Sequence, residues 1–297
     1  MRGKIQGFFS LCLLLSVFFT IPAHGEPDYN KIPIFFVHGY GMKAKCWKPK
    51  MSFLVKNGYP RQYLRAIQLF PDNGSNIKAA EEQIAPAIEE FLISINKFLT
   101  KKHPTMPLKT KIDLISHSMG ALSARWYAAK INPNRVRIWL SLGGANHGTN
   151  AVCPPKSVSP GADDLCPAYA KSAQESFVQY ILNGKPYTAD IDETPYGLGK
   201  DSSGVNSIPP DDIRSILYIS IRTSPDKWIK PEHSAILDGA SGVRLQFPEI
   251  IRSRETSPGN ILMTNGVGHD AMLSDRDTVS LVKTILGAID RNRGIRD

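Results

Sequence analysis

Short apolar runs alternate along the chain with longer segments in which apolar residues recur every three or four positions. The runs are typical of strands buried on both faces of a parallel sheet, and the periodic segments are typical of amphipathic helices. We expect strands at 32–37, 64–70, 111–116, 136–142, 216–221 and 261–264, and helices at 47–56, 76–100, 119–130, 170–182 and 275–292. This alternation predicts one α/β domain with a mostly parallel sheet flanked by crossover helices.

Two segments fall outside this alternation. Residues 150–209 are rich in Pro, Gly, Ser and Asp, and only one helix is expected there. An insertion of this size is usually functional, so we interpret it as a cap or lid whose inner face would include Phe177, Val178, Tyr180, Ile181 and Leu182. The alternative is a static surface segment that forms a wall of the acyl pocket. The closing helix is expected to be capped by Ser274, with Asp277 three residues later.

The first 25 residues have the pattern of a signal peptide. Arg2 and Lys4 precede an apolar run from Phe8 to Ile21, which is followed by the small-residue site Ala23-His24-Gly25. The run is shorter than the roughly 20 residues that a membrane span needs. We therefore expect cleavage after Gly25 and a secreted or periplasmic domain at 26–297.

The whole chain carries a net charge of +9. No run of Lys and Arg is longer than two residues and no nucleic-acid-binding motif is present, so a nucleic-acid partner is not expected. For an exported protein, this charge favours either peripheral contact with an anionic lipid surface or simply a soluble basic surface.

Ser118 is the candidate nucleophile. It lies in Ser116-His117-Ser118-Met119-Gly120, between an expected strand and an expected helix. A nucleophile elbow needs small residues two positions on either side because the Ser takes a strained backbone conformation. Gly120 satisfies this requirement, and Ser116 is a small replacement for the usual Gly.

A Ser nucleophile needs a base and an orienting carboxylate, which follow it in the order acid, then His. His269 follows the last expected strand in a Gly-rich loop, whereas His147 precedes the candidate acids and His233 lies in an expected helical stretch. Asp226 follows the strand at 216–221 and is the preferred acid, with Asp238 as its rival.

An oxyanion hole is expected beside Ser118. The turn His38-Gly39-Tyr40-Gly41 directly follows the first expected strand, where such turns supply a backbone N–H. The second N–H would come from Met119, the residue after the nucleophile. His38 is expected to be structural.

Cys153 and Cys166 lie close together in a Pro-rich loop, and export permits a disulfide between them. Cys12 would leave with the signal peptide. Cys46 is then unpaired, and we assign it no role.

Five motifs, VHGYG, SHSMG, LGGANHGT, SPDKWIKPEHSAILDGA and NGVGHDAML, resemble those of the class 2 triacylglycerol lipase family, which includes minimal bacterial lipases. The resemblance implies an α/β-hydrolase fold and ester hydrolysis without a cofactor or metal. It places the triad at Ser118, Asp226 and His269 and the oxyanion donors at Tyr40 and Met119.

The expected activity is that of an exported serine ester hydrolase acting on lipid esters. A phospholipase, a lipid acyltransferase or a short-chain esterase would use the same triad, since specificity lies in the pockets. A non-catalytic binding protein of the same fold is the alternative from a different class, and an intact triad argues against it.

Overall fold

The computed structural model describes residues 25–153, 158–167, 177–183, 193–194, 197–198, 216–237, 248–257 and 259–293. The expected signal peptide except Gly25, the rival acid Asp238 and much of the insertion lie outside these residues. Within them, no helix combines the length and apolar character that crossing a bilayer requires.

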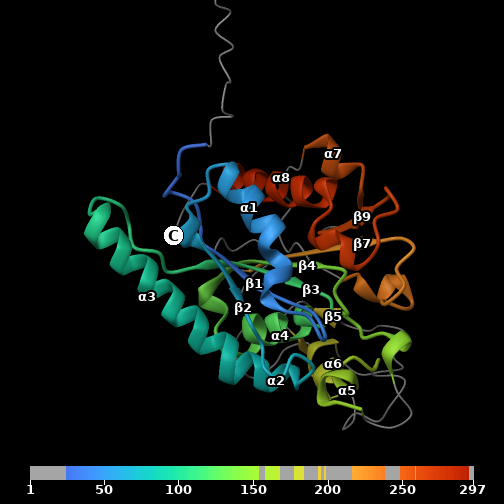
Figure 1. The fold of residues 1–297 in the computed structure, drawn as a ribbon. Helices are drawn as coiled ribbons and strands as arrows, with labels where there is room; N and C mark the ends of the chain where they lie inside the picture. The colour runs from blue at the N-terminus through green and yellow to red at the C-terminus, as the bar shows by residue number, and fades with distance from the viewer. Residues whose placement is uncertain are drawn as a thin grey trace, which may run out of the picture.

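A sheet with the strand order β2-β1-β3-β4-β7-β9-β8 forms the centre of the molecule (Figure 1). Its strands are β1 (Ile34–Val37), β2 (Leu64–Ile67), β3 (Ile112–His117), β4 (Val136–Leu142), β7 (Leu217–Thr223), β8 (Glu255–Ser257) and β9 (Asn260–Met263). All neighbours are parallel except β8 and β9, which are antiparallel. The mostly parallel sheet is confirmed, whereas edge strand β8 had not been predicted. A separate antiparallel pair joins β5 (Glu193–Thr194) and β6 (Gly197–Leu198).

Helices cover both faces of the sheet (Figure 1). One face carries α1 (Lys48–Lys56) and α8 (Arg276–Arg293). The other carries α2 (Asn76–Lys78), which continues through a π-helical segment (Ala79–Ile84) into α3 (Ala85–Lys102), and α4 (Gly120–Trp126), which continues into a second π-helical segment (Tyr127–Ile131). Shorter helices are α5 (Pro160–Asp164), α6 (Phe177–Asn183) and α7 (Glu249–Arg252), and 3₁₀ turns span Ala44–Trp47, Arg61–Tyr63, Pro133–Arg135, Asn150–Val152, Glu232–Ala235 and Asp270–Leu273.

The continuous apolar pattern of the strands has a direct structural counterpart. Along β1, Phe35 and Val37 belong to the apolar cluster beneath α3 and α4, while Ile34 and Phe36 belong to the cluster beneath α1 and α8. Successive side chains of a strand point to opposite faces, so a strand covered on both sides needs apolar residues at every position. The sheet therefore separates two apolar cores.

The start of α8 differs from the expectation. The Oδ2 atom of Asp275 accepts hydrogen bonds from the backbone N–H and the hydroxyl of Thr278, both at 2.8 Å. Asp275 thus caps the helix, and the cap predicted at Ser274 is wrong. The 3₁₀ turn Asp270–Leu273 ends at Ser274, whose N–H donates to the carbonyl of Ala271, so the helix begins one residue later.

Helix α6 is the described part of the helix expected at 170–182. Its Val178 and Leu182 lie in the core beneath α4, and Arg125 of α4 donates to the carbonyl of Leu182 at 2.8 Å and to Oδ1 of Asn183 at 2.7 Å. Val178 and Leu182 are therefore buried against the core in this structure, and the expectation that they line the inner face of a cap or lid stays a prediction.

Candidate active site

Ser118 occupies the sharp turn between β3 and α4. Among the described residues it alone combines a side chain with a left-handed backbone, at φ 53°. Such a conformation costs about 1–3 kcal/mol and persists only where the surroundings enforce it. A Cβ at Gly120 would collide with the carbonyl oxygen of His38, and one at Gly39 would lie 2.8 Å from Cβ of Ser118. The turn therefore requires Gly120, as the sequence pattern predicts, while Ser116 fits because its hydroxyl donates to the carbonyl of Leu140 at 3.3 Å.

Asp226 and His269 form a buried pair. Asp226 lies in the loop after β7 and His269 in the loop after β9, and Nδ1 of His269 lies 2.9 Å from Oδ2 of Asp226. The second oxygen of Asp226 accepts the backbone N–H groups of Trp228 at 2.8 Å and Ile229 at 3.0 Å. The carboxylate accepts three hydrogen bonds and is held in one orientation.

The pKa of Asp226 is lower than that of an ordinary aspartate. Burial alone would raise this pKa, but the hydrogen bond and charge of His269, with the N–H groups of Ile229 and Trp228, outweigh burial. Asp226 is therefore ionised at neutral pH and is suited to stabilise a positive charge on His269.

Ser118 and His269 line one pocket of about 540 Å³. This volume is in the range of small-molecule sites. Its apolar lining comes from the loop after β1, from residues before and within α5, and from the loop after Asp226: Tyr40, Met42, Val152, Val158, Ala162, Leu165, Trp228 and Ile229. No hydrogen bond joins Ser118 to His269 in the described part of the chain, which is common in ligand-free hydrolases.

The backbone N–H groups of Tyr40 and Met119 are the candidate oxyanion donors. Within the described ranges, neither the N–H of Tyr40 nor that of Met119 donates a hydrogen bond to a protein group. His38, two residues before Tyr40, holds the loop after β1 in place. Its Nε2 accepts the N–H of Leu69 at 3.0 Å, and its Nδ1 donates to the carbonyl of Gly39 at 2.9 Å. The hydroxyl of Tyr40 bonds to that of Ser159, which caps α5. The structural role expected for His38 agrees with these contacts.

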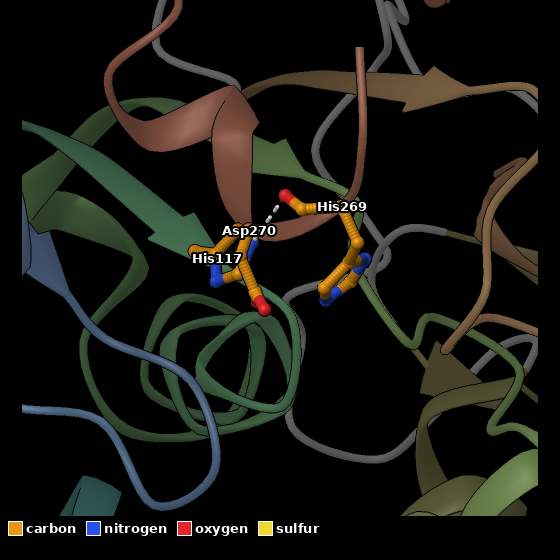
Figure 2. Close-up of side chains that lie close together, drawn as sticks. All are labelled: His117, His269 and Asp270. Carbon is orange, nitrogen blue, oxygen red and sulfur yellow. Dashed lines mark hydrogen bonds between the residues drawn. The ribbon is translucent and has the colours of Figure 1, made fainter. Parts of the chain in front are cut away.

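His117, the residue before the candidate nucleophile, lies directly against His269. Its ring centroid lies 4.6 Å from that of His269, and its Nε2 donates to the backbone carbonyl of His269 at 3.1 Å (Figure 2). Burial and the neighbouring His269 lower the pKa of His117 to about 3, so its imidazole is neutral. The motif around Ser118 places this residue, but only the structure shows that it contacts the loop after β9.

Two further residues support the His269 loop. Gly143, at the end of β4, has φ 53° and lies against the imidazole of His269. Buried Lys50 donates from Nζ to the carbonyl of Met272 at 3.3 Å. Sequence reasoning missed both, although the Gly143-Gly144 pair directly after a strand is a usable signal for close backbone packing.

The remaining candidates are also placed. Cys153 and Cys166 form the expected disulfide, and Cys46 is a free cysteine whose thiol pKa is raised to about 11 by burial. His147 bonds to the carbonyl of Ser234 and His233 is exposed, and neither lines the pocket.

Comparison with known proteins gives one family and one fold. The family model of palmitoyl protein thioesterase matches residues 33–191. The mature lipase BlEst2 of Bacillus licheniformis is 14% identical, with 88% of this chain and 94% of that chain covered and a TM-score of 0.52. The lin2722 product of Listeria innocua is 12% identical, with 85% of this chain and 92% of that chain covered and a TM-score of 0.45. Lipase B of Aspergillus fumigatus is 16% identical, with 88% of this chain and 53% of that chain covered and a TM-score of 0.47. The first likeness supports the fold alone, that of the α/β-hydrolases.

Proposed function

The chain belongs to the palmitoyl protein thioesterase family, and from this premise we propose that it is an exported serine ester hydrolase that cleaves lipid acyl esters through an acyl-enzyme. The family and the fold support hydrolysis of an ester bond. The observation that carries the finer proposal is that the Ser118 elbow lines the same pocket as His269, whose Nδ1 is hydrogen-bonded to buried Asp226.

In the proposed reaction, Ser118 Oγ attacks the acyl carbon while Nε2 of His269 takes the hydroxyl proton. Asp226 keeps the proton on Nδ1 and stabilises the imidazolium, and the N–H groups of Tyr40 and Met119 receive the oxyanion. The imidazolium then returns its proton to the leaving oxygen. Water attacks the acyl-enzyme by the same steps and releases the acid.

The pocket lining supports an acyl substrate. Its wall is mostly apolar, and exposed Tyr40, Val158 and Trp228 lie on its lining, where a hydrocarbon chain would enter. The resemblance to class 2 lipases favours a glycerol ester. A phospholipase, a lipid acyltransferase and a short-chain esterase remain the alternatives of the same chemistry.

The family match favours a second substrate, an acyl thioester. A thioester differs from an ester only in its leaving atom, and the triad and oxyanion donors would act on both. Cleavage of palmitoyl thioesters is therefore the second candidate function.

Export is part of the proposal. It is supported by the Cys153–Cys166 disulfide, since disulfides persist mainly in oxidising compartments. The expected signal peptide would remove two basic residues, Arg2 and Lys4, so the exported domain would keep a net charge of +7, which would favour contact with an anionic lipid surface.

The test is a hydrolysis profile over p-nitrophenyl esters from acetate to palmitate, a triacylglycerol emulsion, a phospholipid and palmitoyl-coenzyme A. We expect the highest kcat/KM on a long-chain acyl substrate and no turnover by Ser118→Ala. Equal rates of the wild type and Ser118→Ala on every substrate would contradict the proposal.

A further inference from the structure

Three side chains that line the pocket lie close together in a way that the reaction does not require. His117, His269 and Asp270 each offer one ligand atom, and these atoms lie within 4.8 Å of one another (Figure 2). We propose that they form an inhibitory binding site for a zinc-like divalent cation, which competes with catalysis; the inhibitory consequence rests on the proposed function, whereas the binding does not.

The hydrogen bonds fix which nitrogens are available. Nδ1 of His269 donates to Asp226, so the lone pair of this imidazole is on Nε2. Nε2 of His117 faces a carbonyl, which can only accept, so the lone pair of this ring is on Nδ1. Both rings therefore present a bare nitrogen, which is the form that binds a metal.

Nδ1 of His117 gives independent support for a ligand. The His117 side chain is fully buried, and its Nδ1 has no hydrogen-bond partner in the described residues, yet the residue lines the pocket. Leaving a buried acceptor without a hydrogen-bond partner is unfavourable, because the atom has lost its contact with water. A cation in the pocket would satisfy this atom.

The ligand set selects the class of cation. Two imidazoles and one carboxylate suit zinc and its transition-metal neighbours, whereas calcium and magnesium prefer oxygen ligands. Asp226 behind His269 supplies the carboxylate–histidine arrangement that orients metal-binding imidazoles. Asp270 is exposed, so the cation can enter from the pocket.

Occupancy would exclude the proposed reaction. The lone pair that would bind the cation is the one on Nε2 of His269 that takes the proton of Ser118. One nitrogen cannot do both, so the cation acts as an inhibitor. The activity of the exported protein would then fall as the zinc concentration around it rises, because a larger fraction of the chains would have zinc bound.

The binding test uses Ser118→Ala, which retains all three ligands, and isothermal titration with ZnCl₂ in a buffer of known zinc affinity. We expect one zinc per chain. Asp270→Asn and His117→Gln, each added to Ser118→Ala, should weaken binding about tenfold or more. The matched controls Glu90→Gln and His233→Gln alter exposed side chains away from the pocket and should leave the affinity unchanged.

A second measurement links the site to Ser118. In the wild type, zinc should slow labelling of Ser118 by a phosphonate ester, and EDTA should restore it; each variant is compared with its own metal-free rate. Absence of stoichiometric zinc binding, or binding unaffected by Asp270→Asn and His117→Gln, would overturn the site. Zinc binding without any effect on labelling would overturn the competition.

Discussion

Gly143 lies directly against the imidazole of His269: a Cβ on Gly143 would stand 2.9 Å from Nδ1 and 3.0 Å from Cε1 of that ring. The nitrogen concerned is the one that bonds to Asp226. The position of the proposed base therefore depends on a residue that has no side chain.

Gly143→Ala should displace the His269 ring and lower kcat by at least about 10²-fold, the scale expected for a 1 Å misplacement at an active site. Gly266→Ala is the matched control, because Gly266 also has a positive φ, at 71°, but open space where its Cβ would be. Both variants carry the same backbone strain. If they lose equal activity on a soluble ester, the contact with His269 is not what Gly143 protects.

Asp226→Asn should lower kcat by roughly 10⁴-fold, because the amide no longer selects the productive tautomer of His269. Asp238→Asn tests the rival acid from the sequence and should change kcat much less. Steady-state kinetics of both variants on one p-nitrophenyl ester makes the comparison. The reverse order of effects would move the acid to Asp238.

Lys50→Met should stabilise the fold at neutral pH. Burial lowers the pKa of Lys50 to about 7, against a partial opposing effect of Asp275, while the unfolded chain keeps the ordinary lysine pKa. Between these two values the unfolded state binds more protons, so the free energy of unfolding rises with pH, by about 2 kcal/mol between pH 7 and pH 9. The variant should lose this rise.

Urea unfolding at the two pH values measures the effect, with exposed Lys48→Met on the same helix as the control. An unchanged pH dependence in Lys50→Met would show that Lys50 remains charged in the folded protein.

The double variant Cys153→Ala/Cys166→Ala should lower the free energy of unfolding by about 3 kcal/mol, the chain-entropy value for a loop of this size. Cys153 and Leu165, next to Cys166, line the pocket, so KM for a long acyl ester should rise more than KM for acetate. Cys46→Ala is the control. A loss below about 1 kcal/mol in the free energy of unfolding would contradict the predicted stabilisation by the disulfide. Equal changes in the two KM values would mean that the disulfide does not shape the acyl site.

The alternation of apolar runs and periodic segments predicted the order of strands and helices because both faces of this sheet are buried. The strand Val136–Leu142 was located without error, since each of its residues is buried. Strand β8 was missed because Glu255–Ser257 is a short, polar edge segment that owes its conformation to pairing with β9. Propensity has little weight at such an edge.

The candidate site was predictable where the proposed chemistry requires a residue type at a fixed place. The strained turn of Ser118 needs Gly120, and each candidate follows a strand of a parallel sheet, so Ser118, Asp226 and His269 could be named together. Contacts between distant loops could not. Arg125 joins α4 to α6, and His117 contacts His269. Both contacts depend on how the connections between distant strands fold together at the carboxyl ends of the sheet.

The central claim is that Ser118 is the nucleophile of an acyl-transfer reaction. Its most direct test is incubation with a long-chain fluorophosphonate, followed by peptide mass spectrometry of the wild type and Ser118→Ala. We expect one adduct per wild-type chain, on the peptide containing Ser118, and no adduct on the variant, whose kcat should fall by about 10⁶-fold. An adduct at another residue, or a variant that retains activity within tenfold of the wild type, would contradict the account.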